Sequence, residues 1–360
     1  MQEQLKKTTS RIPSLDGLRA LAIFLVIEGH LSDRFFQSAK WIPGFGATGV
    51  QLFFVISGFI ITHNLLKERS KTNQINLRSF LIRRFFRIYP TFFVFMILIF
   101  AVSKIFDQHL DLFAYIVILF LLSAIIPVSG GWYIGHAWSL SVEQVFYLIW
   151  PPLLKFGFGI NFLLTSIAIW PFLRLSYYLL CEKNNIFYFP ISDLVYNYIF
   201  MASGCLLAFL INKYEFNTLH QKKWYFFFCI LFIYPFFERF IFENYLLNFK
   251  PAQSYISGLS NLVVAFCFSF TILYLIKINN TIYFKFFNNF VISYIGSISY
   301  SLYLVQQFFT VPERWAYCDL QKSPINITLM IFFTIALYYS VEKPSILFGQ
   351  KLFARQKQNK

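Results

Sequence analysis

The chain has 360 residues, of which 58% are hydrophobic and 22% are aromatic. Only 13% are charged, where a soluble domain typically has about 25%, so the composition excludes a soluble protein and predicts an all-α, polytopic integral membrane helix bundle. The net charge of +15 is concentrated in short loops and tails, which is the positive-inside pattern of membrane proteins and argues against a nucleic-acid partner.

The polar and basic residues 1–13 predict a cytoplasmic tail, and the first span is expected over residues 15–31. This span carries Arg19 and His30, which are eleven positions apart and therefore share one helix face, about 16 Å apart along the axis. Asp16 lies on the same face. Because charge in hydrocarbon is costly, this face is predicted to point into the protein. The alternative is an Arg that snorkels and a His at the interface.

The second predicted span, residues 50–66, contains Ser57 and Gly58, small residues that let another backbone approach closely. The most basic segment follows at residues 67–87 and is predicted to be cytoplasmic. Its end carries Arg83, Arg84 and Arg87, of which the last two share a helix face. Such a cluster fits phosphate oxygens well, although basic helix ends also serve simply to orient a span or to touch anionic lipid.

The third span is predicted over residues 88–106, and a fourth apolar run covers 112–127. The motif WSLSVEQVFY then places an acid, Glu143, among apolar residues, with Trp138 and Ser139 close by. A buried carboxylate without a partner is costly, so Glu143 is expected to meet an Arg, a His or a substrate hydroxyl. An interfacial Glu at a helix N-terminus is the alternative.

Further apolar runs bring the total to eleven, whereas two basic termini on one side of a membrane require an even number. We therefore predict about ten full spans, with one run within residues 112–160 that re-enters or bends instead of crossing. The later runs cover 144–158, 160–181, 194–212, 224–237, 256–276, 290–310 and 325–341. A single membrane domain is predicted over residues 14–342, followed by a basic cytoplasmic tail over 343–360.

The five cysteines are scattered singly and show no metal-ligand spacing, so neither a metal site nor a permanently bound cofactor is expected. The stretch from Ser293 to Gln307 carries Ser and Tyr residues, including Tyr300, at helical spacing. Such groups suit polar helix–helix contacts more often than catalysis.

Six motifs follow one another along the chain: LDGLRA with Arg19 eleven positions before His30, FFVISGFII, RRFFRIYP, WSLSVEQVFYLIWP, SYSLYL and SVEKP. Together they resemble the family-three membrane acyltransferases, which O-acylate bacterial surface polysaccharides, lipid-linked sugars and some small molecules. The resemblance covers essentially the whole chain and implies that residues 14–342 form a membrane acyltransferase domain.

The resemblance implies a role for each candidate residue. His30 would be the catalytic base, Arg19 its companion, and Glu143 the acid that orients His30 or the acceptor. The residues Arg83, Arg84 and Arg87 would hold acyl-coenzyme A, most often acetyl-coenzyme A, as the donor substrate. Arg19 or a backbone donor near Ser57 and Gly58 would stabilise the oxyanion. Supporting roles are expected for Asp16, Ser57, Gly58, Trp138, Ser139 and Tyr300.

The implied reaction moves an acyl group from cytoplasmic coenzyme A to a glycan or glycolipid hydroxyl at the outer side of a bacterial inner membrane, with both termini in the cytoplasm. Many relatives carry a His where this chain has Gln306, so a second His role is not expected there. Fused relatives have a periplasmic hydrolase-like domain, and this chain is expected to act alone or with a separate periplasmic partner.

Two other classes of function use the same features. A transporter or flippase for a lipid-linked saccharide would treat Arg19 and His30 as binding or proton-relay groups in the same polar cavity. It predicts internal repeats, and the motif-bearing half and the Phe-rich half of the sequence do not resemble each other. A structural scaffold would need neither an Arg nor a His on one intramembrane face.

Overall fold

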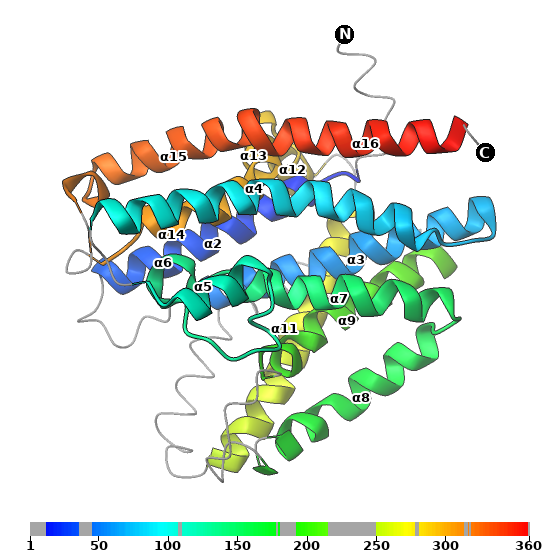
Figure 1. Ribbon diagram of the computed structural model, residues 1–360. Helices are drawn as coiled ribbons and strands as arrows, with labels where there is room; N and C mark the ends of the chain where they lie inside the picture. The colour runs from blue at the N-terminus through cyan, green and yellow to red at the C-terminus, as the bar shows by residue number, and fades with distance from the viewer. Residues whose placement is uncertain are drawn as a thin grey trace.

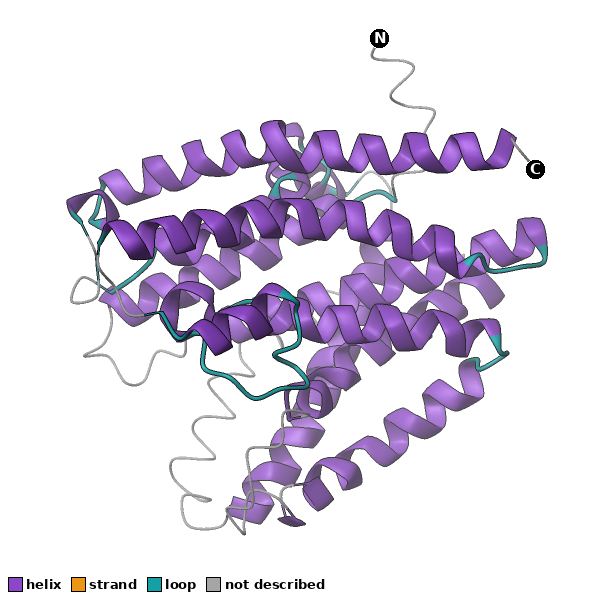
Figure 2. Cartoon of the chain, in the orientation of Figure 1, coloured by secondary structure: helices purple, strands orange, loops and turns teal. Residues whose placement is uncertain are grey.

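The architecture of the protein was analysed in a computed structural model. It describes residues 12–35, 45–106, 110–177, 179–180, 192–214, 250–277, 281–312, 316 and 318–358. In these ranges the chain forms helices joined by turns and loops, with no strand (Figure 2). The predicted all-α class is therefore confirmed.

Seven helices have 18 or more residues: α2 (Leu15–Phe35), α3 (Gly46–Thr72), α4 (Leu77–Ile105), α7 (Trp138–Lys155), α8 (Ile160–Tyr177), α9 (Ser192–Lys213) and α11 (Lys250–Lys277). Shorter helices are α5 (Leu112–Leu119), α6 (Gly131–Gly135), α12 (Ile282–Phe287), α13 (Phe290–Ser297), α14 (Ser299–Phe309) and α15 (Ile325–Leu337). A π-helical segment (Tyr338–Glu342) leads from α15 into α16 (Lys343–Gln358).

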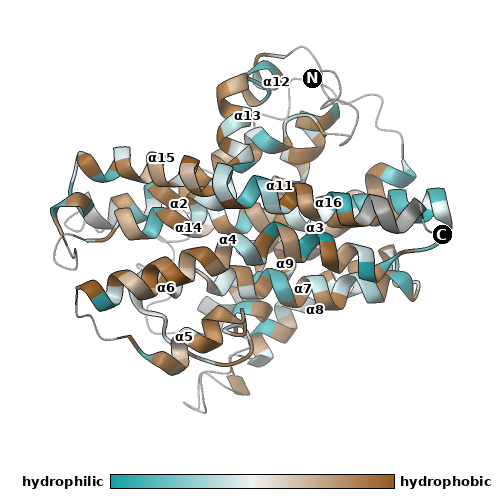
Figure 3. Ribbon diagram, turned by 45° about the horizontal axis from the view of Figure 1, so that its top comes forward, coloured by the Kyte–Doolittle hydropathy of each residue, from teal (hydrophilic) through white to brown (hydrophobic). Residues whose placement is uncertain are grey.

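Helices α2, α3, α4 and α7, and the stretch from α15 to α16, run in a similar direction across the view, whereas α8 and α11 lie obliquely to them (Figure 1). The turn between α3 and α4 and the end of α16 lie at the right of the view, and we call this side, with residues 67–87, the basic end. The end of α2, together with α6 and the start of α15, lies at the left, which we call the far end. Apolar residues dominate the helices, and hydrophilic residues gather toward the basic end (Figure 3).

Six of the described stretches are long and apolar enough to cross a membrane: Gly46–Thr72, Leu77–Ile105, Ile160–Tyr177, Asp193–Lys213, Ile256–Lys277 and Ile325–Leu352. The protein is thus a multi-pass membrane helix bundle, while the predicted total of ten spans stays a prediction. The apolar run 224–237 lies outside the described residues. The run 112–127 forms only the eight-residue α5 and a series of turns, so it does not cross, as expected for one run within 112–160.

The predicted run 290–310 is not one continuous helix, because the helix breaks at Ile298 between α13 and α14. The break follows Gly296 and Ser297, which are weak helix formers, and irregular backbone is tolerated at membrane depth where protein buries it. The boundary drawn between residues 342 and 343 falls inside a helical stretch that continues from α15 through α16.

The ends of α2 are tied to other parts of the bundle. Ser14, just before α2, donates its backbone N–H to the Asn288 side chain, and its hydroxyl donates to the Leu275 carbonyl. Near the far end, the Glu28 carboxylate accepts from the backbone N–H of Phe45 at the start of α3. The helix face with Arg19 is therefore held in one orientation relative to α3 and α14, against which α2 packs.

Small residues allow α3 and α9 to pack closely. A Cβ added at Gly58 would overlap the Met201 carbonyl, and one added at Gly204 would overlap the Val55 carbonyl. Each helix thus presents a glycine to the backbone of the other, as membrane helices commonly do. Gly58 therefore faces α9, one position along from Ser57.

We expect Gly204→Ala to lower the free energy of unfolding by about 1–3 kcal/mol, because the new methyl group must push two helices apart. A loss of stability would be informative, because alanine is by itself a better helix former than glycine and would otherwise stabilise α9. Thermal unfolding in detergent measures the change. Gly135→Ala is the matched control, because a Cβ there meets nothing within 4 Å. Equal melting of the two variants would contradict the close packing.

Candidate active site

An internal cavity of about 90 Å³ lies among helices α2, α3, α4, α7 and α14. Its charged and polar lining residues are Arg19, Ser57, Arg84, Arg87, Ser139, Glu143, Tyr147, Ser299, Tyr300 and Tyr303. Seven of these were predicted as site residues, namely Arg19, Ser57, Arg84, Arg87, Ser139, Glu143 and Tyr300. The fold therefore brings together residues from five of the six sequence motifs. We call this cavity the inner cavity.

Glu143 is held by two hydroxyl groups on the wall of the inner cavity. The Ser57 hydroxyl on α3 donates to one carboxylate oxygen at 2.5 Å, and the Tyr147 hydroxyl donates to the other at 2.7 Å. Tyr147 is one helical turn after Glu143, so the pair shares a face of α7. Glu143 was expected to meet an Arg, a His or a substrate hydroxyl, and the hydrogen-bond partners found are two hydroxyl groups of the protein itself. His30 does not line this cavity, so the expected role of Glu143 in orienting His30 or the acceptor stays a prediction.

Arg19 enters the inner cavity from α2, where Asp16 pairs with it through an Nη1–Oδ1 distance of 3.0 Å. The predicted Asp16–Arg19 face is thus confirmed, and about a fifth of each side chain is exposed. A carboxylate on one side of the guanidinium fixes its orientation and leaves its other N–H groups available. The backbone N–H groups of Ser57 and Gly58 lie within α3 and bond inside the helix. Arg19 is therefore the better candidate for an oxyanion donor.

Three of the four arginines of α4, namely Arg83, Arg84 and Arg87, line two cavities. Arg84 and Arg87 line the inner cavity, and both also line a second cavity of about 370 Å³ toward the basic end, which we call the vestibule. Arg83 lines only the vestibule. Ile60 and Ile61 complete the shared wall, so the two cavities adjoin. The prediction that Arg84 and Arg87 share a face is confirmed.

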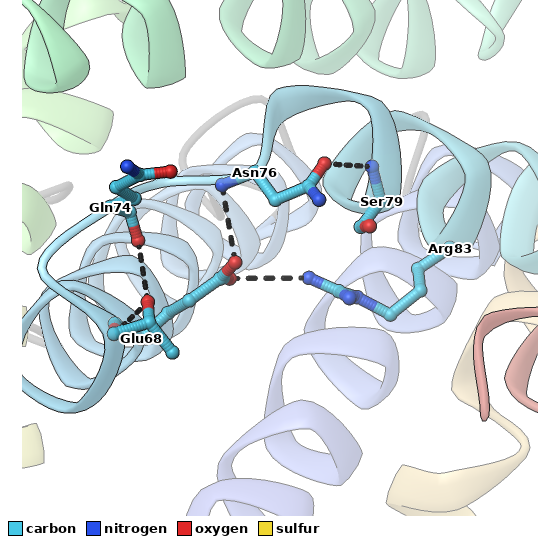
Figure 4. A network of polar contacts seen from close by, with 6 residues as sticks. Glu68, Gln74, Asn76, Ser79 and Arg83 are labelled. Carbon is cyan, nitrogen blue, oxygen red and sulfur yellow. Dashed lines mark hydrogen bonds and ion pairs between the residues drawn. The ribbon is translucent and has the colours of Figure 1, made fainter. Parts of the chain in front are cut away.

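Arg83 is held at the mouth of the vestibule by the end of α3 (Figure 4). Its guanidinium lies 3.5 Å from a Glu68 carboxylate oxygen, and the other oxygen of Glu68 accepts from the Asn76 backbone N–H. Asn76 in turn caps α4 by accepting from the Ser79 backbone N–H. The network ties the basic turn to the start of α4 and holds Arg83 in place.

Arg84 is also positioned by aromatic rings. Its guanidinium lies 5.3 Å from the Tyr147 ring centroid and 5.5 Å from that of Phe80. Such cation–π contacts stabilise a guanidinium away from bulk water. The result is a partly buried, positively charged group with N–H donors that face two cavities.

His30 lies toward the far end, away from the arginines. Its ring packs edge-on against Trp132 of α6, with the ring centroids 5.3 Å apart. Between it and the inner cavity lie Tyr303 and His136, whose ring centroids are 5.3 Å apart. The Tyr303 hydroxyl lies 2.6 Å from the Ser139 hydroxyl and donates to the His136 carbonyl. Arg19 lines the inner cavity and His30 does not, so the predicted path between them stays a prediction.

The remaining predicted residues surround the inner cavity. Tyr300 lines it and donates its hydroxyl to the Ile88 carbonyl of α4. Trp138 packs against Phe54, one of the lining residues, with ring centroids 6.1 Å apart. Gly58 faces α9 and does not line the cavity. Gly58 instead allows α3 and α9 to approach each other closely.

Four site residues were missed from the sequence. Tyr147, Ser299 and Tyr303 line the inner cavity. The one-turn spacing of Tyr147 from Glu143 and of Tyr303 from Tyr300 would have placed these two on the right faces. Glu342 of the SVEKP motif is 2% exposed and accepts from the Ser301 hydroxyl at 2.5 Å. It lies in the π-helical segment, and such segments are frequent at functional sites. The acid in the polar SVEKP motif was the sequence signal that could have identified Glu342.

The arrangement has the chemistry of an anion-binding site inside a membrane protein. Guanidinium groups are suited to phosphate, and the carboxylates of Asp16, Glu143 and Glu342 limit the net positive charge in their neighbourhood. Among the described residues, no group of His, Cys, Asp and Glu side chains could hold a metal ion. Fold and site together define a polytopic membrane protein with an arginine-lined internal cavity, which adjoins a second arginine-lined cavity toward the basic end.

Comparison with known proteins identifies the family. The family described as an acyltransferase domain matches residues 12–342, and the chain belongs to it. The peptidoglycan O-acetyltransferase OatA of Listeria monocytogenes is 35% identical over 176 residues, which are 42% of this chain and 26% of that protein. A Staphylococcus aureus (strain COL) protein named as a candidate O-acetyltransferase is 28% identical over 379 residues, covering 92% of this chain.

The chain spans 57% of the length of that Staphylococcus aureus relative. The O-acetyltransferase OatA of Staphylococcus aureus (strain NCTC 8325) is 34% identical over 166 residues, or 40% of this chain and 25% of that protein. No solved structure matched the chain.

Proposed function

We propose that the protein is a membrane O-acyltransferase that moves an acyl group, most often acetyl, from acyl-coenzyme A to a hydroxyl of a surface polysaccharide or lipid-linked sugar. The observation that carries the proposal is the division of the arginines between two adjoining cavities. A vestibule with three arginines and a narrow inner cavity with two of them fit a ligand with a large anionic head and a thin arm.

The two volumes suit the two parts of the donor. The vestibule, at about 370 Å³, lies in the range of cavities that hold small-molecule ligands, whereas the inner cavity, at about 90 Å³, admits only a slender group. The diphosphate of coenzyme A would lie against Arg83, Arg84 and Arg87. The pantetheine arm would then carry the thioester past Arg84 and Arg87 toward Arg19. Acyl-coenzyme A acts here as a substrate and is released as the free thiol.

In the proposed reaction, the acceptor oxygen bonds to the thioester carbonyl carbon and the C–S bond breaks. His30 takes the proton of the acceptor hydroxyl, and the coenzyme leaves as a thiolate that regains a proton. The Arg19 guanidinium, oriented by Asp16, would stabilise the developing oxyanion. Because Tyr303 lies between the inner cavity and His136, the thioester must pass this ring to approach His30.

The orientation follows from charge. The basic end would face the cytoplasm, where acyl-coenzyme A is made, and the far end with His30 would face the outer side of a bacterial inner membrane. Both termini would then be cytoplasmic.

The acceptor is inferred from the names of the relatives. These names give O-acetylation and, for the Listeria monocytogenes protein, peptidoglycan, so a cell-surface glycan is the proposed acceptor. Membrane lipids surround the bundle, and a separate periplasmic partner would hand the acyl group on if the chain does not reach the glycan itself.

The experiment that tests this proposal uses the purified full chain in detergent with acetyl-coenzyme A labelled in the acetyl group. We expect saturable binding of the coenzyme and transfer of label to an added glycan as a base-labile ester. A transporter or flippase for a lipid-linked saccharide would instead move its substrate without forming an ester. Failure of acetyl-coenzyme A to bind, with the protein folded, would overturn the proposed function.

We expect Tyr147→Phe to lower the rate of acetyl transfer about tenfold, because it removes one of the two hydrogen bonds to Glu143 on the cavity wall. The ring beside Arg84 is retained, so the change isolates the hydroxyl. Tyr115→Phe is the matched control, because its buried hydroxyl donates to the Met96 carbonyl outside the cavity. Steady-state kinetics compares the two. Equal rates would show that the hydroxyl of Tyr147 has no part in the reaction.

A further inference from the structure

His136 is a buried polar residue that the proposed reaction does not yet use. It is 5% exposed and lies at the C-terminal end of α6, with its ring against Phe95 and Tyr303. Among the described residues, none makes a hydrogen bond of good geometry with its ring nitrogens, although the Gln307 side chain and the Leu304 backbone lie near the ring. Buried polar groups are paired in the great majority of cases, and an unpaired one costs about 1–3 kcal/mol. A ligand or water is therefore expected at these nitrogens.

A second unpaired polar group lies beside it. Gln307 of α14 is 6% exposed and lies close enough to the His136 ring to interact with it, although its side-chain oxygen makes no hydrogen bond to a described residue. The backbone carbonyl of Gln307 accepts from the Trp132 indole N–H at 2.8 Å. The indole, in turn, packs against the His30 ring. Four residues from α2, α6 and α14 thus surround one place at the far end.

The chemistry of this place differs from that of the inner cavity. A neutral imidazole offers one donor and one acceptor, and the Gln307 oxygen is an acceptor. His30 is the titratable group that interacts with His136. The inner cavity and the vestibule are lined by arginines suited to phosphate, whereas this neutral set, flanked by an indole, is suited to a hydroxyl group, which both donates and accepts.

We propose that His136, Gln307 and Trp132 form a binding site for the acceptor sugar, in which a neutral hydroxyl-bearing ring is held next to His30. The inference rests on the proposed function and adds to it the place and the chemical class of the acceptor. His136 and Gln307 would bond to hydroxyl groups of the sugar, and Trp132 would contact its apolar face. The donor and the acceptor then meet from opposite ends at the level of Tyr303.

The test uses the full chain in detergent, labelled acetyl-coenzyme A and chitotetraose as the acceptor probe. We expect Gln307→Leu and His136→Gln to raise the KM for chitotetraose about tenfold or more and to leave the Kd for acetyl-coenzyme A within twofold. Gln307→Leu is expected to fold, because it removes a buried unpaired group and does not break a bond of its side-chain oxygen. Thr271→Val is the matched control, since it removes a buried unpaired hydroxyl on α11.

The outcomes separate the two proposals. An unchanged KM for chitotetraose in both variants would overturn the sugar site, and water would then be the partner of His136. The same conclusion follows if the variants change only the melting temperature. Binding of acetyl-coenzyme A by the wild-type chain without any chitotetraose-dependent transfer would also overturn the sugar site while leaving the donor site in place. Loss of coenzyme binding in the wild-type chain would overturn the proposed function itself.

Discussion

Replacing His30 by Ala should lower the rate of acetyl transfer by about 10²- to 10⁴-fold, the usual contribution of a general base. The expected loss follows from the proposed role of the ring as the base, and from its position against Trp132 at the far end. Since His30 lies outside the inner cavity, the Kd for acetyl-coenzyme A should stay within twofold of the wild-type value. Rapid-quench measurement of labelled ester gives the rate, and equilibrium binding gives the Kd.

His63→Ala is the matched control for this experiment. His63 lies on α3, stacks on Phe59 with ring centroids 5.6 Å apart, and lines neither cavity, so its loss should leave the rate within twofold. Transfer by His30→Ala at the wild-type rate would remove His30 from the reaction. In that case His136, the second imidazole of the far end, is the group to examine next. A lower rate with equally weaker coenzyme binding would instead show that His30 acts on the donor.

Loss of the inner arginines should abolish donor binding. We expect Arg84→Gln and Arg87→Gln each to raise the Kd for acetyl-coenzyme A about 10- to 100-fold, because a hydrogen bond between charged groups is worth about 1.5–3 kcal/mol. Both residues line the inner cavity and the vestibule, so each can contact the diphosphate or the arm. The double variant should show no measurable binding. Isothermal titration of the purified protein measures these constants.

Arg83 provides an internal comparison. It already pairs with Glu68 and lines only the vestibule, so Arg83→Gln should raise the Kd less than either inner variant. Its contribution should also fall more steeply with added salt, since about a third of its side chain is exposed. Arg78→Gln is the matched control, because Arg78 has the same charge on the same helix but is exposed and lines neither cavity. A Kd that changes equally in all four variants would indicate general attraction of an anion and not a built site.

The sequence predicted well which residues share a face of a single helix. Arg19 with Asp16, and Arg84 with Arg87, were expected on common faces and are found there, because residues three apart on a helix are neighbours whatever surrounds them. The predicted exception within residues 112–160 also holds, since α5 is too short to cross. Predictions that needed contacts between helices were less secure. The hydrogen bonds of Glu143 to Ser57 and Tyr147 were not predicted, and its expected role in orienting His30 or the acceptor stays a prediction.

By itself, the sequence determined the class of protein, the basic side of the bundle and the residues that carry charge into it. These follow from composition and from the 3.6-residue period, which are local properties of the chain. Only the tertiary structure decided which of those residues share a cavity. The inner cavity joins α2, α3, α4, α7 and α14, Arg83 turns instead to Glu68, and the break at Ile298 sets where Tyr303 and Gln307 lie. Each depends on how distant helices rotate and pack against one another, and no local pattern contains that information.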